Sequence, residues 1–197
     1  MIHAVLIFNT TGTSRLTKFY LPPSSLTPAQ KAALPAQIFH LVSARPSSLC
    51  CFLDAPSLST TWEPDTRIVY RCYATLFFVF VVDSSESELG ILDLIQVFVE
   101  SLDRAFENVC ELDLVFHFDQ VHHILAEIIQ GGLVLETNVD EIASAVSESR
   151  KARKESYSAA NPLSLAGSTG GMGQRGANSI STPLGWLAGK VSGLTSG

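Results

Sequence analysis

The stretch from Ile68 to Phe116 constrains the fold most, because it joins a long apolar run directly to an amphipathic pattern. Residues Thr75 to Val82 are apolar at almost every position and rich in Phe and Val, which is typical of a strand buried on both faces. Ser85 followed three residues later by Glu88 is a capping-box pattern, which predicts that a helix begins there. A doubly buried strand beside such a helix favours a sheet covered by helices.

The predicted helix has one apolar face and one polar face. Its apolar stripe steps by three and four residues through Leu89, Leu92, Ile95, Val99, Leu102 and Phe106. Its polar face carries Asp93, Gln96, Glu100, Asp103 and Glu107. We expect the polar face to meet water or a polar partner.

The part of the chain before this stretch alternates between strand-like and breaker-rich segments. Thr27 before Pro28 predicts a helix through Ala44, which Pro35 should kink or split. Apolar runs predict further strands at Ile2–Phe8, which should be central, and at Leu16–Leu21, Cys50–Leu53 and Arg67–Cys72. Between these, Ala55–Asp65 reads as a polar loop.

After the long helix, Asn108–Phe116 predicts a compact apolar return of the chain. A second helix should end at the pair Gly131 and Gly132, and Asn138 with Glu141 should cap a last helix. The inward residues of these two helices are expected to be Val121, Leu125, Ile128, Ile142 and Val146. The order of elements predicts an α/β layer fold of the α+β type, with a five-stranded, mostly antiparallel sheet and helices on both faces.

Length and composition predict one folded domain over residues 1–156 and a low-complexity tail over 157–197. The tail is rich in Ser, Gly, Ala and Asn, and is expected to be disordered because it can bury little apolar surface. Residues 1–149 carry 7 Lys or Arg against 18 Asp or Glu, a net charge of −11, whereas residues 150–197 carry 6 against 1. An acidic body argues against nucleic acid as the main partner.

The sequence indicates a protein of the reducing cytosol. Its N-terminus lacks the basic and small-residue pattern of a secretory signal, and Asp83 interrupts the longest apolar run. The cysteines show neither CxxC spacing nor a disulfide framework, so we expect reduced thiols in the core. They are Cys50, Cys51, Cys72 and Cys110.

Motifs for catalysis, metal or cofactor binding are weak. The run from Gly171 to Gly176 matches G-x-G-x-x-G, but it neither follows a strand nor opens a helix, so we reject a dinucleotide site. Asp119 and His122 or His123 could share a helix face and ligate a metal, yet helix-surface histidines are common and no further ligand is evident. We therefore predict no catalytic residue, no metal and no cofactor.

Three segments identify a family resemblance. They are similar to the small (sigma) subunits of the adaptor-protein complexes that select cargo for coated vesicles. The first segment contains MIHAVLIFN and SRLTKFY, the second is IVYRCYATLFFVFVVD, and the third is FVESLDRAFENVCELDLVFHFDQVHHILAE. The resemblance covers roughly Met1 to Glu141. SSESELGILDLIQVFVE with GGLVLETN looks most like the sigma subunit of the third adaptor complex. The stretch Pro22–Pro35, the loop Ala55–Asp65 and the long tail depart from the pattern.

The resemblance implies a longin-like fold, a five-stranded antiparallel sheet flanked by helices. It also implies a non-enzymatic role as one subunit of a heterotetramer, bound directly to a large delta subunit and assembled with beta and mu subunits. Such complexes lie on the cytoplasmic face of Golgi and endosomal membranes and on transport vesicles. The expected ligands are cargo tails carrying the acidic dileucine signal (D/E)xxxL(L/I), on a route to the vacuole or lysosome.

The family's cargo site falls on residues of matching chemistry in this chain. The resemblance puts a basic contact for the acidic residue of the signal on Arg15, and two leucine-sized pockets on Ala74, Leu76, Val99, Asn108, Val109 and Leu114. The competing interpretation is that the apolar members are core residues and that Arg15 is a charge at a turn edge. Three further alternatives are a structural subunit without cargo binding, a longin-type regulator of a small GTPase, and a hydrolase that uses the region from His117 to His123.

Overall fold

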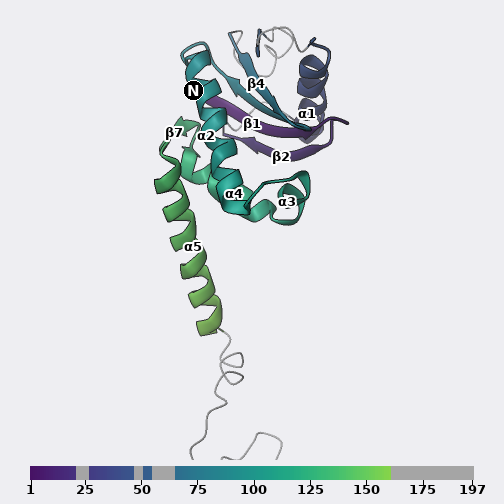
Figure 1. Ribbon diagram of the computed structural model, residues 1–197. Helices are drawn as coiled ribbons and strands as arrows, with labels where there is room; N and C mark the ends of the chain where they lie inside the picture. Colours follow the sequence, from purple (N-terminus) through teal and green to yellow (C-terminus); the bar gives the residue numbers. More distant parts are fainter. Residues whose placement is uncertain (21–26, 47–50, 55–64, 161–197) are drawn as a thin grey trace, which may run out of the picture. The chain divides into compact units, whose positions relative to one another are not determined.

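The computed structural model describes residues 1–20, 27–46, 51–54 and 65–160, and Met1–Glu155 form one compact unit. A five-stranded antiparallel sheet has the strand order β2-β1-β5-β4-β3 (Figure 1). Its strands are β1 (Ile2–Asn9), β2 (Ser14–Phe19), β3 (Phe52–Asp54), β4 (Arg67–Tyr73) and β5 (Leu76–Val82). A separate hairpin consists of β6 (Ile129–Gln130) and β7 (Leu133–Val134). The helices are α1 (Pro28–Ser43), α2 (Glu88–Phe106), α3 (Glu111–Phe116), α4 (Phe118–Ile128) and α5 (Val139–Ala160).

The inner strands of the sheet are apolar throughout because both of their faces are covered. Every residue of β1 is buried, as are six of the seven residues of β5. These two strands are antiparallel neighbours with strands on both sides, so each is internal in the sheet. The continuous apolar runs of the sequence therefore predicted central strands correctly.

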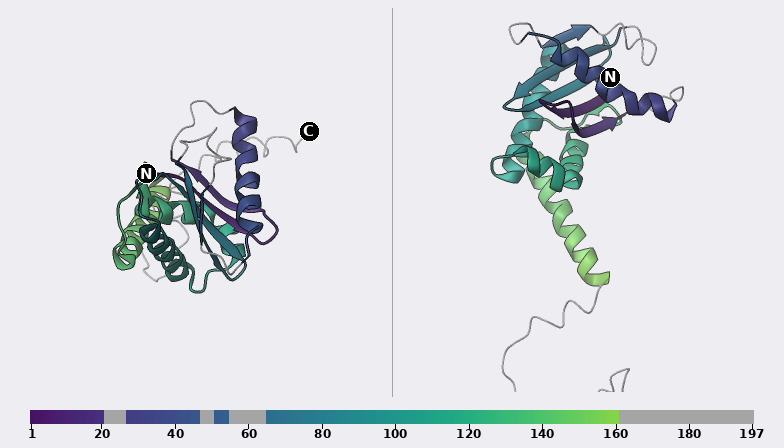
Figure 2. Two further views of the ribbon diagram at one scale, coloured as in Figure 1. Left: turned by 90° about the horizontal axis from the view of Figure 1, so that it is seen from above. Right: turned by 90° about the vertical axis from the view of Figure 1, so that its right-hand side faces the viewer.

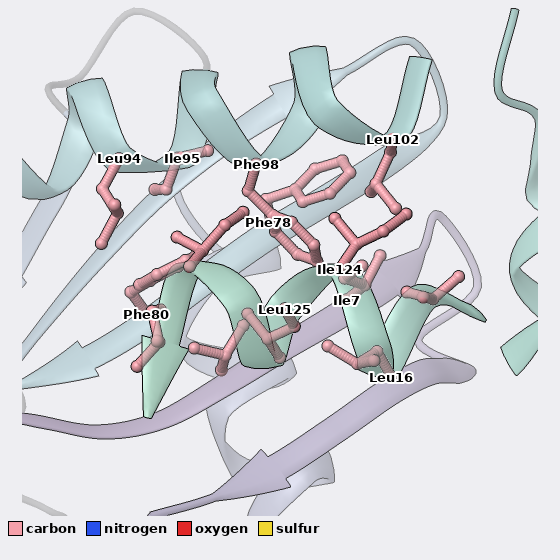
Figure 3. Packing of buried hydrophobic residues seen from close by; sticks show 14 of the residues in the cluster. Ile7, Leu16, Phe78, Phe80, Leu94, Ile95, Phe98, Leu102, Ile124 and Leu125 are labelled. Atoms are coloured by element: carbon pink, nitrogen blue, oxygen red, sulfur yellow. The ribbon is translucent and has the colours of Figure 1, made fainter. Parts of the chain in front are cut away.

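Helices cover the two faces of the sheet separately (Figure 2). On one face, Leu34, Ile38 and Val42 of α1 pack against side chains of β1, β4 and β5. On the other face, α2 and α4 bring Phe98, Leu102, Ile124 and Leu125 into a larger core, in which Phe78 and Phe98 meet edge to face (Figure 3). This arrangement confirms the predicted fold class.

The helix α2 begins later than predicted. Its N-cap is Ser87, whose Oγ accepts a hydrogen bond from the backbone N–H of Gly90, while Ser85 instead contacts Asp83. Glu88 forms an ion pair with Arg67, 3.0 Å away, and so leaves the predicted capping box unused. The predicted N-cap, Ser85, lies two residues before the observed one because this serine-rich turn contains more than one possible capping residue.

The predicted apolar stripe of α2 was partly wrong. Leu89 is 68% exposed, and Leu92, Val99 and Phe106 are only half-buried. Apolar residues cover a wide arc of this helix, and its contacts with β4, β5 and α4 select which part of the arc is buried. The buried residues are Ile91, Leu94, Ile95, Phe98, Ser101 and Leu102. The predicted polar face is exposed along its length.

Three further predictions need correction. The return over residues 108–116 contains the short helix α3. The second helix ends at Ile128, and Gly131 and Gly132 form the turn between β6 and β7, because both have positive φ angles that suit a tight hairpin. The proline in α1 does not split that helix, since apolar packing against the sheet continues on both sides of it.

The C-terminal helix and the cysteines also differ from expectation. Ile142 and Val146 point inward as predicted, but α5 runs to Ala160, past the predicted start of the tail. The rest of the tail, the G-x-G-x-x-G match, nearly all of the loop Ala55–Asp65 and Cys50 lie outside the described residues. The three described cysteines are free thiols, but Cys72 and Cys110 are exposed and so are not core residues. Cys72 lies near the end of β4, just before the turn to β5, and Cys110 lies directly before α3.

Candidate functional site

Three of the predicted site residues, Arg15, Ala74 and Leu76, lie at one end of the sheet. In the β1–β5 pairing, Asn9 lies opposite Leu76, so the end of β1 and the beginning of β5 coincide. Ala74 lies in the tight turn that joins β4 to β5 at this end. The turn from β1 to β2 lies at the same end, and Arg15 follows it near the start of β2. The strand register therefore joins segments that are about 60 residues apart in sequence.

Four of the predicted pocket residues belong to one apolar group. Leu76 of β5 and Leu114 of α3 are 7% and 1% exposed, and both lie in the core beneath α2. Val99 of α2 and Val109, between α2 and α3, pack against the same core but are only half-buried. A ligand would therefore reach this group first through the two valines.

The other two predicted residues lie where the backbone reverses. Ala74 and Asn108 are exposed and have φ angles of 51° and 82°, in the left-handed region that non-glycine residues seldom adopt. Glu107, with φ 52°, ends α2, and the backbone N–H of Val109 donates to Asp103 Oδ1 at 3.1 Å. Two successive left-handed residues turn the chain sharply from α2 toward α3.

Arg15 is paired with a carboxylate that the sequence did not predict. Its Nε and Nη2 lie 2.8 and 2.7 Å from Oε1 of Glu111, the first residue of α3. Asn9 Nδ2 donates to the same oxygen at 3.1 Å. The Arg15 guanidinium and then the Asn9 amide lower the pKa of Glu111 below its ordinary value. Both partners lie about 100 residues away in sequence, so no periodicity could have indicated them.

The candidate metal residues do not form a metal site. Within the described ranges, no group of three or more His, Cys, Asp or Glu side chains could hold a metal ion. His123 and Asp119 instead face Arg153 of α5, whose Nη1 lies 2.5 Å from His123 Nε2 and 3.9 Å from Asp119 Oδ2. They line a pocket of about 200 Å³ between α4 and α5. His122 is not among the residues that line this pocket, and burial lowers its pKa.

Comparison with known proteins gives a consistent result for most of the chain. The family model described as "Clathrin adaptor complex small chain" matches residues 1–153. AP-3 complex subunit sigma of Schizosaccharomyces pombe is 54% identical over 156 residues, which are 79% of this chain and 90% of that protein. AP-3 complex subunit sigma-2 of Homo sapiens is 52% identical over 155 residues, covering 78% and 77% of the two chains.

Further matches agree with these two. AP-3 complex subunit sigma of Dictyostelium discoideum is 51% identical over 172 residues, which are 87% of this chain and 96% of that protein. Among known structures, a chain of a homology model of the full-length AP-3 complex in a stretched open conformation is 46% identical. The TM-score is 0.61, and the match covers 80% of this chain and 98% of that one.

Proposed function

Since the chain belongs to the clathrin adaptor complex small chain family, and is thus a non-enzymatic subunit of a vesicle-coat adaptor, we propose that it recognises acidic dileucine signals, (D/E)xxxL(L/I), on cargo tails. We place it in a complex of the AP-3 type because its relatives carry that name. The proposed route runs from Golgi and endosomal membranes to the vacuole or lysosome. Attachment to the membrane would be peripheral, through the assembled complex.

The observation that carries this proposal is the meeting of an apolar group and a guanidinium at one end of the sheet. Val99, Val109 and Leu114 lie in one cluster, and α3, which carries Leu114, is joined to Arg15 through Glu111. A dileucine signal needs this combination, because its leucines require apolar walls and its acidic residue requires a cation. Asn108 is exposed, directly before Val109 in the chain, and could hydrogen-bond an extended peptide backbone.

The expected affinity is modest. Burial of two leucine side chains contributes about 1.5–3 kcal/mol each. A half-exposed arginine adds little, since solvent screens its charge, and ordering a flexible tail costs part of the total. The site should therefore bind an isolated signal peptide with micromolar affinity, which suits a coat that must later release its cargo.

An exposed apolar surface supports a direct partner. The side chains of Leu112, Val115, Phe116 and Phe118, in α3 and at the start of α4, are between 41% and 73% exposed. Contiguous apolar surface of this kind marks an interface. We propose that the large delta subunit covers it, with beta and mu subunits completing the heterotetramer. The structure describes no helix that is both long and apolar enough to cross a bilayer.

One alternative has specific support, namely a structural subunit that binds no cargo. Leu76 and Leu114 present almost no surface, and Arg15 is already paired with Glu111. Under this alternative the apolar group is core, and sorting is performed by other subunits.

A peptide titration on the chain co-expressed with its large partner subunit separates the two. A fluorescent ExxxLL peptide is titrated beside an ExxxAA control against wild type, Val99→Asp and the matched surface variant Leu89→Asp. We expect binding that requires both leucines, falls at least about tenfold in Val99→Asp and persists in Leu89→Asp. Absence of leucine-dependent binding, with the subunits still co-purifying, would favour the structural alternative.

A further inference from the structure

Arg15 contacts Glu111 through one edge of its guanidinium. Nε and Nη2 share that edge, and both point at Oε1 of the carboxylate. Arginine has five N–H donors in a fixed plane, so the edge formed by Nη1 and the second Nη2 hydrogen faces away from this contact. That second edge has the geometry to bind another carboxylate in a bidentate manner. One arginine could therefore hold Glu111 and a ligand carboxylate together.

Glu111 is held by more than Arg15. Asn9 is buried, and its Oδ1 accepts hydrogen bonds from the backbone N–H groups of Thr11 and Thr13 at 3.1 and 2.8 Å. These contacts fix the amide so that Nδ2 points at Glu111 Oε1. The oxygen thus receives three donors from two residues of the β1–β2 hairpin. To displace Glu111 from Arg15, a ligand would have to break both contacts with the guanidinium while Asn9 still holds the carboxylate beside it, so sharing Arg15 costs less than displacement.

We propose that Glu111 is a specificity-determining residue of the cargo site, which stays bound to Arg15 in the complex with cargo and limits the preference for an acidic signal residue. The inference rests on the proposed function and concerns the same site. Glu111 orients the open edge of Arg15, but its negative charge also cancels the charge of Arg15. A cargo carboxylate therefore meets a nearly neutral pair rather than an isolated cation.

This pairing has a consequence for which signals are accepted. Two carboxylates on one guanidinium lie close enough to repel each other, and this repulsion offsets part of the attraction to Arg15. Recognition then depends more on the two leucines, and loss of the acidic residue lowers the affinity of a signal less than it would beside an unpaired arginine. Removal of the charge at residue 111 should make the site more selective for acidic signals.

The test compares two peptides, ExxxLL and QxxxLL, on the full chain co-expressed with its large partner subunit. The readout is the ratio of their dissociation constants, which cancels effects on the leucine contacts. Glu111→Gln keeps an oxygen that can accept from Asn9 and Arg15 but removes the charge. Glu107→Gln is the matched control, because Glu107 is exposed and lies just before α3. Melting temperature reports whether each variant is folded.

We expect Glu111→Gln to raise the preference for ExxxLL over QxxxLL roughly 3- to 10-fold at low salt, and the gain to shrink at high salt. Glu107→Gln should leave the ratio unchanged, and Arg15→Gln in the Glu111→Gln background should abolish the gain. An unchanged or smaller ratio in folded Glu111→Gln would overturn the inference and leave Glu111 as a structural link between α3 and the hairpin. If wild type binds neither peptide, the proposed function fails and the inference with it.

Discussion

Asp83, just after β5, joins that strand to the beginning of the chain. The Met1 ammonium lies 2.6 Å from its Oδ1, and the backbone N–H of Ser85 donates to the same oxygen at 3.0 Å. Burial raises the pKa of Asp83, but the hydrogen bonds from the ammonium and from Ser85 outweigh it and lower the pKa to about 2. A carboxylate with a depressed pKa stabilises the fold wherever it is ionised.

Because of this contact, we expect Asp83→Asn to lower the free energy of unfolding by an amount that depends on pH. The ordinary pKa of 3.8 falls to about 2, so the stabilisation is complete above pH 3.8 and is lost as the pH falls toward 2. After allowance for solvent screening, we expect a loss of about 1–2 kcal/mol of unfolding free energy at pH 7. Urea unfolding of wild type and variant at pH 7, 5 and 3 measures it.

The exposed carboxylate Asp93 on α2 supplies the control. Asp93→Asn changes the net charge by the same amount. It should change the free energy of unfolding by less than about 0.5 kcal/mol at every pH, as is usual for surface substitutions. The difference between wild type and Asp83→Asn should shrink below pH 4. A difference that stays constant down to pH 3 would mean that the contact does not depend on ionisation.

Single residues also mark the limit of what sequence can predict about the site. The resemblance supplied Arg15, Val99 and Leu114. In the structure, Glu111 joins Arg15 to the start of α3, and Leu114 and Val99 pack into the core beneath α2. The resemblance did not supply Glu111 or Asn9, because a contact between residues about 100 positions apart depends on strand register and on the position of α3. The resemblance thus supplied Arg15 as a candidate, but not the carboxylate with which it is paired. Cargo binding by these residues stays a prediction.

At the scale of elements, the β6–β7 hairpin depends on two adjacent glycines with different surroundings. Gly131 and Gly132 have φ angles of 60° and 81°. A Cβ on Gly131 would meet no atom within 4 Å, whereas a Cβ on Gly132 would lie 2.5 Å from the carbonyl oxygen of Ile2. The backbone N–H of Ile2 also donates to Gly132 O at 2.9 Å. The hairpin therefore packs its turn directly on the start of β1.

These surroundings predict that the two alanine substitutions lower the free energy of unfolding by different amounts. Gly131→Ala should cost about 1 kcal/mol, which is the strain of a positive φ angle without a steric clash. Gly132→Ala should cost at least about 2 kcal/mol more, since backbone atoms on either side must move. Thermal unfolding of the two variants measures the difference, and each serves as the control for the other. Equal costs would show that the turn moves away from β1 easily.

Elements were predicted best where one pattern was continuous. The unbroken apolar runs of β1 and β5, and the helical spacing of apolar residues along α4, can be recognised from neighbouring residues alone. The N-cap of α2 and the end of α4 were misjudged because several serines and glycines offered equivalent local signals. Selection among them depends on tertiary contacts such as the ion pair of Glu88 with Arg67 and the packing of Gly132 on β1.

At the scale of the whole molecule, the two faces of the sheet are covered, yet α3 and the start of α4 leave apolar side chains in solvent. Phe116 and Phe118 are 73% and 61% exposed. The sheet and its helices therefore form a complete core, but no described part of it covers these apolar side chains. A subunit whose partner covers such a surface gains stability from assembly, because binding to the folded state alone shifts the unfolding equilibrium.

The double substitution Phe116→Ser and Phe118→Ser tests this division between core and interface. Because both side chains are exposed, the isolated chain should keep its melting temperature within about 3 °C and become more soluble. Co-purification with the large subunit should fall at least about tenfold, since buried aromatic side chains dominate most interfaces. Solubility, thermal unfolding and pull-down of the tagged large subunit measure the three effects.

The matched control is Leu133→Ser with Leu135→Ser, which removes two exposed leucines, 59% and 58% accessible, from the β7 region. If the partner binds through α3 and α4, this control should co-purify normally. Loss of the partner in both double variants would point to an interface that extends over both regions. Retention in the phenylalanine variant would leave the exposed rings of α3 and α4 for another partner, and would separate the large-subunit interface from the end of the sheet where Arg15 lies.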